Sequence, residues 1–162
     1  MFKQLLVRDD LNHLLLSDVN KLVQHIAVEF PDVVKLKTIG TSWQERPLYM
    51  LEIDARDFLN KQAVYQHDLL NKPAILLTGA HHSRELISIQ MPLYSVLKML
   101  HGGIVHNDSH YIDLLAANKY YVVPVVNVDG LADIEEIFIS TGKMTTRRKN
   151  MNPENSSDCP DE

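Results

Sequence analysis

The stretch Ala74-Ile75-Leu76-Leu77-Thr78-Gly79-Ala80-His81-His82-Ser83-Arg84-Glu85 decides the fold. It opens with a compact apolar run, which is typical of a strand buried on both faces. From Arg84 to Leu100 the apolar residues return at helical spacing. The stretch therefore predicts a buried strand, a polar turn and a helix, and such a turn is where open α/β sheets usually carry their chemistry.

Strands and helices alternate on both sides of this stretch. A helix is expected after Ser17, which serves as its cap, and Pro31 stops it. Glycine, serine and proline between two strand-like runs favour a turn and hence an antiparallel pair. The alternation predicts an α/β layered domain. The expected elements around the stretch are a helix at about 18–30, strands at 33–39 and 48–53, a short helix around 111–117 and a second buried strand at 120–126.

Prolines and glycines mark expected irregularities. Pro92 should kink the helix around it, and Gly102-Gly103 should end that helix. Pro124 removes one donor from its strand, so a sheet edge or a local irregularity is expected there. Residues 141–162 contain few apolar groups and are interpreted as an extended polar loop.

Composition excludes several classes of protein. A chain of 162 residues accommodates one ordinary domain, and its net charge of −5 argues against a nucleic-acid binder. No apolar run approaches the roughly 18 residues of a membrane span. Eight histidines against the single Cys159 favour His and carboxylate ligands for any metal. The first residues form no convincing signal peptide, because Arg8, Asp9 and Asp10 interrupt the apolar start.

The polar turn offers a pair of metal donors in two alternative registers. Imidazole nitrogen and carboxylate oxygen both suit zinc. His81 and Glu85 are four residues apart, as on a continuous helix face, whereas His82 and Glu85 are three apart, which suits a loop entering a helix. The residues alone leave both registers open, and an isolated pair of this kind is more often surface decoration.

Four segments in the same order resemble the zinc metallocarboxypeptidases of the pancreatic carboxypeptidase family, peptidase M14. The turn resembles that family's H-S-R-E zinc-binding segment, and the other three resemble its hairpin, its N-P-D-G strand end and its R-K-N/T segment. The matching segments are Gly79–Glu85, Ile39–Ser42 with Arg46–Leu48, Val125–Gly130 and Arg148–Asn150. The resemblance implies a mixed, mostly parallel sheet with helices on both faces, here incomplete.

The resemblance also implies roles for four residues. His82 and Glu85 would be ligands of Zn²⁺, which selects one of the two registers. Arg84 would contact the substrate backbone or its carboxylate, and Arg148 would polarise the scissile carbonyl and stabilise the oxyanion. A guanidinium suits that task because it stays charged and offers several donors. The implied reaction is hydrolysis of the C-terminal peptide bond of a peptide or protein.

This sequence also departs from the family pattern. Glu45 replaces a glycine, Val128 replaces a proline, and Thr146-Arg147 stands where many members have an aromatic residue. The family's third zinc ligand, tyrosine and general base follow later segments, and the chain stops at Glu162. Residues 1–162 are therefore expected to be the N-terminal portion of a catalytic domain, inactive alone because catalytic zinc normally has three protein ligands.

Two other functions remain as alternatives. A degenerate relative could act as a non-catalytic binding or structural component, and related zinc deacylases also use an H-x-x-E pair. Ser83-Arg84 and the R-K-N segment favour the peptidase. An incomplete sheet is expected to expose apolar strand residues and so to cause self-association or to require a partner fragment. The residues expected to be exposed are Val122, Val125 and Val126.

Remaining candidates have simpler interpretations. His101, His106 and His110 form a loose group that we interpret as solvated loop histidines. Glu135 and Glu136 are interpreted as a solvated helix face rather than a replacement base. We also expect His13 and His25 at the surface, Trp43 in packing or partner contact, and one of Tyr120 and Tyr121 inward. Ser156 to Cys159 resembles the context of a family disulfide, which would imply an extracellular or secretory compartment.

Overall fold

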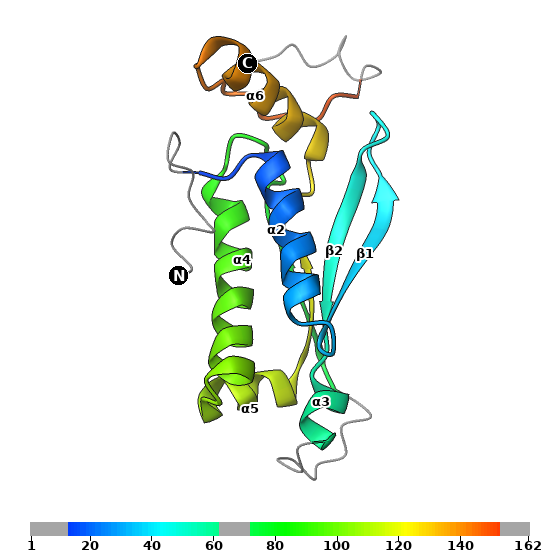
Figure 1. Ribbon diagram of the computed structural model, residues 1–162. Coiled ribbons are helices and arrows are strands. Elements are labelled where there is room, and N and C mark those ends of the chain that lie inside the picture. Colours follow the sequence, from blue (N-terminus) through cyan, green and yellow to red (C-terminus); the bar gives the residue numbers. More distant parts are fainter. Residues whose placement is uncertain (1–12, 62–71, 153–162) are drawn as a thin grey trace.

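The computed structural model describes residues 13–61 and 72–152 (Figure 1). Residues 1–12, Cys159 and the end of the predicted polar loop lie outside the described residues. Among the described helices, none is long and apolar enough to cross a membrane. The elements in chain order are α2 (Leu16–Glu29), β1 (Val34–Thr41), β2 (Pro47–Ile53), α3 (Arg56–Lys61), β3 (Ala74–Thr78), α4 (Ile87–Leu100), the π-helical turn η2 (His101–Val105), α5 (Ser109–Ala117), β4 (Lys119–Val123) and α6 (Val128–Thr141).

The four described strands form one mixed sheet in the order β1-β2-β4-β3. β1 and β2 form the predicted antiparallel hairpin, with an irregularity in register between Thr38 and Gly40. β2 also pairs antiparallel with β4, while β3 pairs parallel with β4. The mixed α/β fold is therefore confirmed, although only one of the three pairings between described strands is parallel.

The helices α2 and α4 lie on the same side of the sheet (Figure 1). α2 packs on β1 and β2, and α4 packs on β3. The core lies between these layers, where Leu51 and its cross-strand partner Val122 are completely buried. On β3, the side chain of Leu76 is left 63% exposed.

β3 carries exposed apolar residues, which corrects two expectations. Val122 and Val125 are buried, at 0% and 3% exposure, and Val126 is half-buried. Val122 is covered because β4 lies between β2 and β3. β3 was expected to be buried on both faces, but Ile75 and Leu76 are exposed. The physical reason is position: β3 is the last strand of the described sheet, so its outer edge has no neighbouring strand in that part of the chain.

Several helix boundaries differ from the sequence-based expectation. α2 begins one residue before Ser17, and the amide of Leu15 donates to Asp18 Oδ2 at 3.1 Å. Pro92 lies within α4. Gly102 and Gly103 do not end the helical path, which continues through η2. A Cβ on Gly102 would lie 2.2 Å from the ring of Tyr111 on α5, so close packing of two helical segments requires this glycine.

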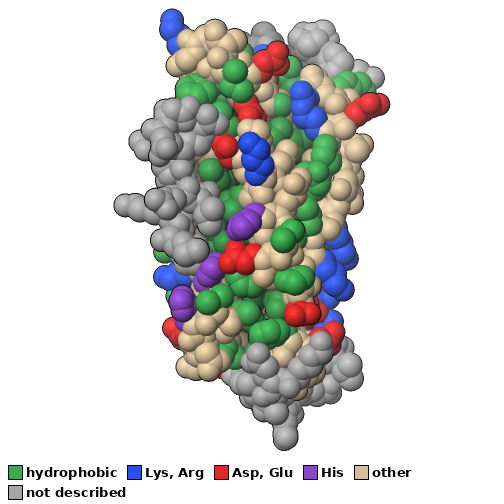
Figure 2. All heavy atoms as spheres, viewed as in Figure 1, with side chains coloured by type: hydrophobic (Ala, Val, Ile, Leu, Met, Phe, Trp, Pro, Cys, Tyr) green, Lys and Arg blue, Asp and Glu red, His purple; other side chains and the backbone are tan. Residues whose placement is uncertain are grey.

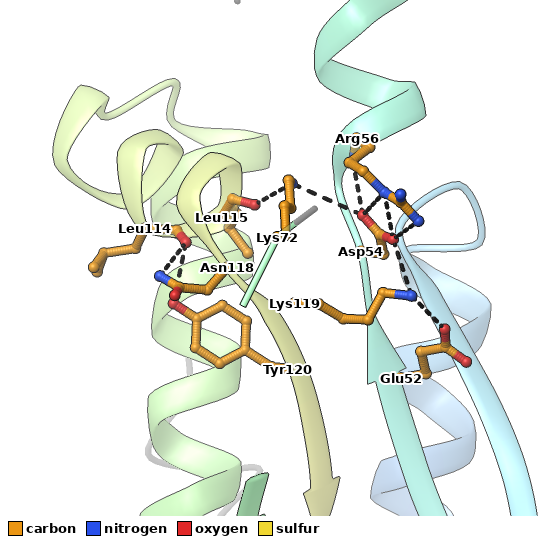
Figure 3. Close-up of polar contacts among 9 residues, drawn as sticks. All are labelled: Glu52, Asp54, Arg56, Lys72, Leu114, Leu115, Asn118, Lys119 and Tyr120. Atoms are coloured by element: carbon orange, nitrogen blue, oxygen red, sulfur yellow. Dashed lines mark hydrogen bonds and ion pairs between the residues drawn. The ribbon is translucent and has the colours of Figure 1, made fainter. Parts of the chain in front are cut away.

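A charged network lies at one end of the sheet (Figure 3). Lys119 on β4 reaches Glu52 at 3.1 Å and Asp54 at 3.3 Å. Arg56 donates from Nε to Asp54 at 2.8 Å, and the largely buried Lys72 donates to the carbonyl of Leu115 at 3.0 Å. These contacts link the end of β2 with β4, α3 and the end of α5 (Figure 3).

Candidate functional site

The polar turn after β3 is held by hydrogen bonds to the segment that follows β4 and to the end of β4 itself. The amide of Gly79 donates to the carbonyl of Val123 at 3.0 Å. The amide of Asn127 donates to the carbonyl of Ala80 at 2.9 Å. A Cβ on Gly79 would lie 2.3 Å from the carbonyl oxygen of Ser88, so only glycine fits there. Ala80 has a positive φ of 46°, which turns the chain away from the strand direction. The side chains after it are thus presented at the carboxyl end of β3.

The structure brings His82 and Glu85 together within this turn. His82 Nδ1 lies 2.8 Å from Glu85 Oε1, and the two side chains are 37% and 49% exposed. His81 is exposed and makes no contact of this kind with Glu85 in the described residues. α4 begins only at Ile87, so the pair lies in a turn before the helix rather than on a helix face. This backbone path accounts for the contact between residues that are three apart.

His82 and Glu85 match a zinc site in donor type but supply only two donors. An imidazole nitrogen and a carboxylate oxygen that converge within hydrogen-bonding distance can approach one ion together. Catalytic zinc usually has three protein ligands. Within residues 13–61 and 72–152, no group of three or more His, Cys, Asp or Glu side chains could hold a metal ion. The described pair therefore fits part of a zinc ligand set.

The segment before Asn150 is attached to this turn through Ser83. Ser83 is completely buried, and its Oγ donates to the carbonyl of Arg147 at 2.7 Å. Its amide donates to the carbonyl of Arg148 at 3.4 Å. Asn127 Nδ2 donates to the same carbonyl at 3.3 Å. Three donors thus hold the backbone of the two arginines against the turn that carries His82 and Glu85.

The arginines line a pocket beside the turn. Its volume is about 290 Å³. Arg84 lies on one side of it and donates weakly to the carbonyl of Thr146 at 3.5 Å. The sequence placed Arg84 and Arg148 at one site, and the structure does bring them to one pocket. The lining residues are Arg84, Asp133, Ile137, Thr145, Thr146, Arg147, Arg148 and Lys149.

The tip of the β1–β2 hairpin is attached to the first turn of α6. Asp129 is 3% exposed and accepts from Ser42 Oγ at 2.6 Å, from the amide of Gln44 at 3.1 Å and from Arg46 at 3.0 Å. Ser42 Oγ also accepts from the amide of Arg46 at 3.0 Å. The hairpin and strand-end segments, far apart in sequence, therefore meet through one buried carboxylate.

The remaining sequence candidates lie apart from this site. Figure 2 shows histidine side chains gathered near acidic side chains on the face that α2 and α4 form. His101 is not a solvated loop residue: it is buried, lies 3.2 Å from Glu29, and packs edge-on to Phe30. His106 and His110 are exposed, as expected.

The positions of several other side chains can be compared with the sequence-based interpretations. Glu135 is not simply solvated, because its carboxylate accepts from the amide of Ser17 at 3.0 Å. Tyr120 points inward at 5% exposure, and Trp43 is 55% exposed. His25 is exposed and lies 3.5 Å from Glu29, while half-buried His13 contacts Gln90.

Sequence reasoning missed the residues that assemble the pocket. Ser83, Asn127 and Gly130 meet closely, since a Cβ on Gly130 would lie 2.6 Å from Ser83 Oγ and 2.9 Å from Asn127 Nδ2. Asp133 was missed because nothing in the sequence indicates that the side chain of Arg147 points toward α6. A signal existed for the first three, which all fall inside the quoted segments.

Comparisons with known proteins agree on one family. The model of the family described as zinc carboxypeptidase matches residues 19–161. A zinc carboxypeptidase of Saccharothrix mutabilis subsp. capreolus is 28% identical over 129 residues, which are 80% of this chain and 26% of that protein. Carboxypeptidase B of Rattus norvegicus is 32% identical over 108 residues, 67% of this chain and 23% of that protein.

Solved structures share the fold. Thrombin activatable fibrinolysis inhibitor superposes with a TM-score of 0.69 at 24% identity, covering 87% of this chain and 30% of that one. Carboxypeptidase A of Helicoverpa armigera gives a TM-score of 0.63 at 24% identity, covering 89% and 31%. The chain therefore spans less than a third of the length of these proteins. The sequence match extends over almost the whole chain, and this chain belongs to the zinc carboxypeptidase family.

Proposed function

We propose that this chain contributes to zinc-dependent hydrolysis of the C-terminal peptide bond of peptides or proteins. His82 and Glu85 would hold the ion through Nδ1 and a carboxylate oxygen. Zinc bound there supplies Lewis acidity toward a carbonyl oxygen and toward water. The observation that carries the proposal is the junction at Ser83, which attaches the backbone of Arg148 directly to the turn of the donor pair.

The arginines supply the remaining chemistry that these residues can perform. Arg148 is exposed beside the pocket, where its guanidinium can donate to an oxyanion that develops on the scissile carbonyl. Arg84 can donate to a backbone carbonyl or a carboxylate of the bound peptide. Neither task needs the arginine to transfer a proton, and a guanidinium remains charged throughout.

We further propose that residues 1–162 do not turn over a substrate on their own. The turn provides two donors, His82 and Glu85, and the described residues contain no group of three or more side chains that could hold the ion. The expected result is no release of amino acid from a blocked dipeptide in the presence of zinc. Robust turnover that a chelator abolishes would contradict this second proposal and would mean that a further donor acts on the site.

Zinc titration by calorimetry tests the site itself. The unmodified chain should bind zinc weakly, and His82→Ala and Glu85→Ala should each abolish the binding. His106→Ala is the matched control, since it removes an exposed histidine outside the turn. Equal affinity in all four proteins would remove the assignment of His82 and Glu85 as ligands.

The exposed edge of β3 supports a proposal about partners. Ile75 and Leu76 are 38% and 63% exposed at the last strand of the described sheet. Such an edge offers unpaired backbone donors and acceptors beside apolar side chains. The chain would therefore associate with itself or with a fragment that adds a strand at β3.

A further inference from the structure

Two adjacent arginines, Arg147 and Arg148, lie in a segment that is neither helix nor strand. From residue 145 to residue 150, intermediate and exposed residues alternate one by one. This alternation is the pattern of an extended backbone, in which successive side chains point to opposite sides. Both arginines line the pocket, but Arg147 is half-buried and Arg148 is exposed, although the residues are neighbours in sequence.

Arg147 is held from both ends. Its Nε donates to Asp133 Oδ2 on α6 at 2.6 Å, and these side chains are only 26% and 21% exposed. Its carbonyl accepts from the buried Ser83 Oγ at 2.7 Å. A charge-assisted hydrogen bond of this length is among the stronger polar contacts in proteins. The side chain of Arg147 is thus committed to α6.

In the described part of the chain, Arg148 is held through its backbone. Its carbonyl accepts from the amide of Ser83 and from Asn127 Nδ2. Within residues 13–61 and 72–152, its side chain forms no ion pair, and the residue is exposed. The guanidinium of Arg148 is consequently available beside the pocket, whereas that of Arg147 is neutralised by Asp133.

We propose that Asp133 is a positioning residue that selects which of the two adjacent arginines is presented. In an extended segment, a slip of one residue exchanges the sides on which neighbouring side chains lie. Such a slip would move Arg147 out of its contact with Asp133 and break both hydrogen bonds from Ser83. Asp133 and Ser83 therefore oppose the slip together, one through the side chain and one through the backbone.

This inference rests on the proposed function only for the task of Arg148, which is to donate to an oxyanion. The selection itself is measurable without zinc or substrate. Phenylglyoxal modifies accessible, unpaired guanidinium groups, and tandem mass spectrometry resolves modification at adjacent residues. In the unmodified chain, Arg148 should react about tenfold faster than Arg147, because the charged hydrogen bond protects Arg147.

Three variants test the role of Asp133. Asp133→Asn should bring the two rates to within about threefold, since a neutral amide binds guanidinium less strongly. Asp133→Glu keeps the charge and should keep most of the selectivity. Glu136→Gln on the same helix removes an exposed carboxylate and should leave the selectivity unchanged. Arg46, which is paired with Asp129, serves as an internal control for folding because it should remain slow.

The outcomes separate clearly. Similar rates at Arg147 and Arg148 in the unmodified chain would overturn the proposal, as would unchanged selectivity in Asp133→Asn. If Asp133→Asn makes Arg46 reactive, the charge-exchanged double variant Asp133→Arg with Arg147→Asp replaces it. In that double variant, Arg148 must stay reactive toward phenylglyoxal, while the arginine introduced at position 133 must react slowly. A failure of the chain to bind zinc leaves these rates unaffected, so failure of the proposed function is distinguishable.

Discussion

Asp129 shows how much of the site depends on single residues. This buried carboxylate receives hydrogen bonds from Ser42, Gln44 and Arg46 and so attaches the hairpin tip to α6. Two residues before it, Asn127 holds the carbonyl of Arg148. The placement of Arg148 is therefore coupled to the hairpin through a few buried polar contacts, which are costly to break because the remaining partners lose their hydrogen bonds.

Removing this carboxylate should weaken the whole domain. Asp129→Ala leaves the donors on Ser42 and Gln44 without this acceptor and leaves Arg46 without its counter-charge. We expect the free energy of unfolding to fall by about 2–4 kcal/mol, as measured by urea denaturation. Asp32→Ala, at an exposed position, is the control and should change it by less than about 0.5 kcal/mol. A loss no larger than that of the control would refute the role given to Asp129.

Gly130 gives a second test at this scale. A Cβ there would lie 2.8 Å from the carbonyl oxygen of Lys149 and 2.6 Å from Ser83 Oγ. Gly130→Ala should therefore push segment 147–149 away from the turn and lower the unfolding free energy by about 1–3 kcal/mol, although alanine favours helices. Gly40→Ala is the matched control, because its Cβ would meet nothing within 4 Å. A stabilised Gly130→Ala variant would show that the segment yields without cost.

At the scale of elements, the charged network holds the end of the sheet together. A hydrogen bond from Lys37 lowers the pKa of Glu52 below its ordinary 4.5, despite partial burial. Burial alone would raise the pKa of Asp54, but hydrogen bonds from Arg56 and Lys119 outweigh it and place this pKa below the ordinary 3.8. Both carboxylates thus favour the folded state when they are charged.

The lowered pKa values of Glu52 and Asp54 make the stability of the fold depend on pH. Carboxylates with a lowered pKa in the folded state bind fewer protons there than in the unfolded state. Their contribution is complete above the ordinary values and disappears as the pH falls through the lower folded values. Acidification below about pH 4 should therefore weaken the junction of β2 and β4.

Lys119→Met isolates this contribution. At pH 7 the variant should be about 1 kcal/mol less stable than the unmodified chain, since the network is partly exposed and screened by solvent. The difference should shrink as the pH falls below the ordinary values of 4.5 and 3.8 and the two carboxylates take up protons. Urea denaturation across this pH range measures it, with Lys21→Met on the exposed face of α2 as the control. A difference that is independent of pH would exclude the carboxylates as its cause.

At the scale of the whole molecule, the edge at β3 governs association. Size-exclusion chromatography should show oligomers of residues 1–162, and a dye for apolar surfaces should bind. Leu76→Lys places a charge on the exposed edge strand and should shift the chain toward monomer. Ile139→Lys is the control, because Ile139 is 70% exposed on α6, away from the sheet edge. A monomer with a cooperative melt and no dye binding would contradict the proposal.

The sequence predicted those features that depend on neighbouring residues. Periodicity located the hairpin, α2, α4 and β4 to within a few residues, because the spacing of apolar side chains reflects which side of an element is buried. It placed a polar turn after β3, and the order of four segments indicated the family. The polar segments that meet at Ser83 were recognisable as motifs, although not as one junction.

Only the tertiary structure decided how these elements share their surfaces. A central strand and an edge strand can have the same apolar sequence pattern. The pairing of the strands places β4 inside the described sheet and β3 at its exposed edge. The arginines at 147 and 148 are chemically identical in sequence, and only the approach of α6 assigns Asp133 to one of them. The physical reason is that local spacing determines the secondary structure, whereas burial and pairing of charges depend on contacts between residues that are distant in the chain.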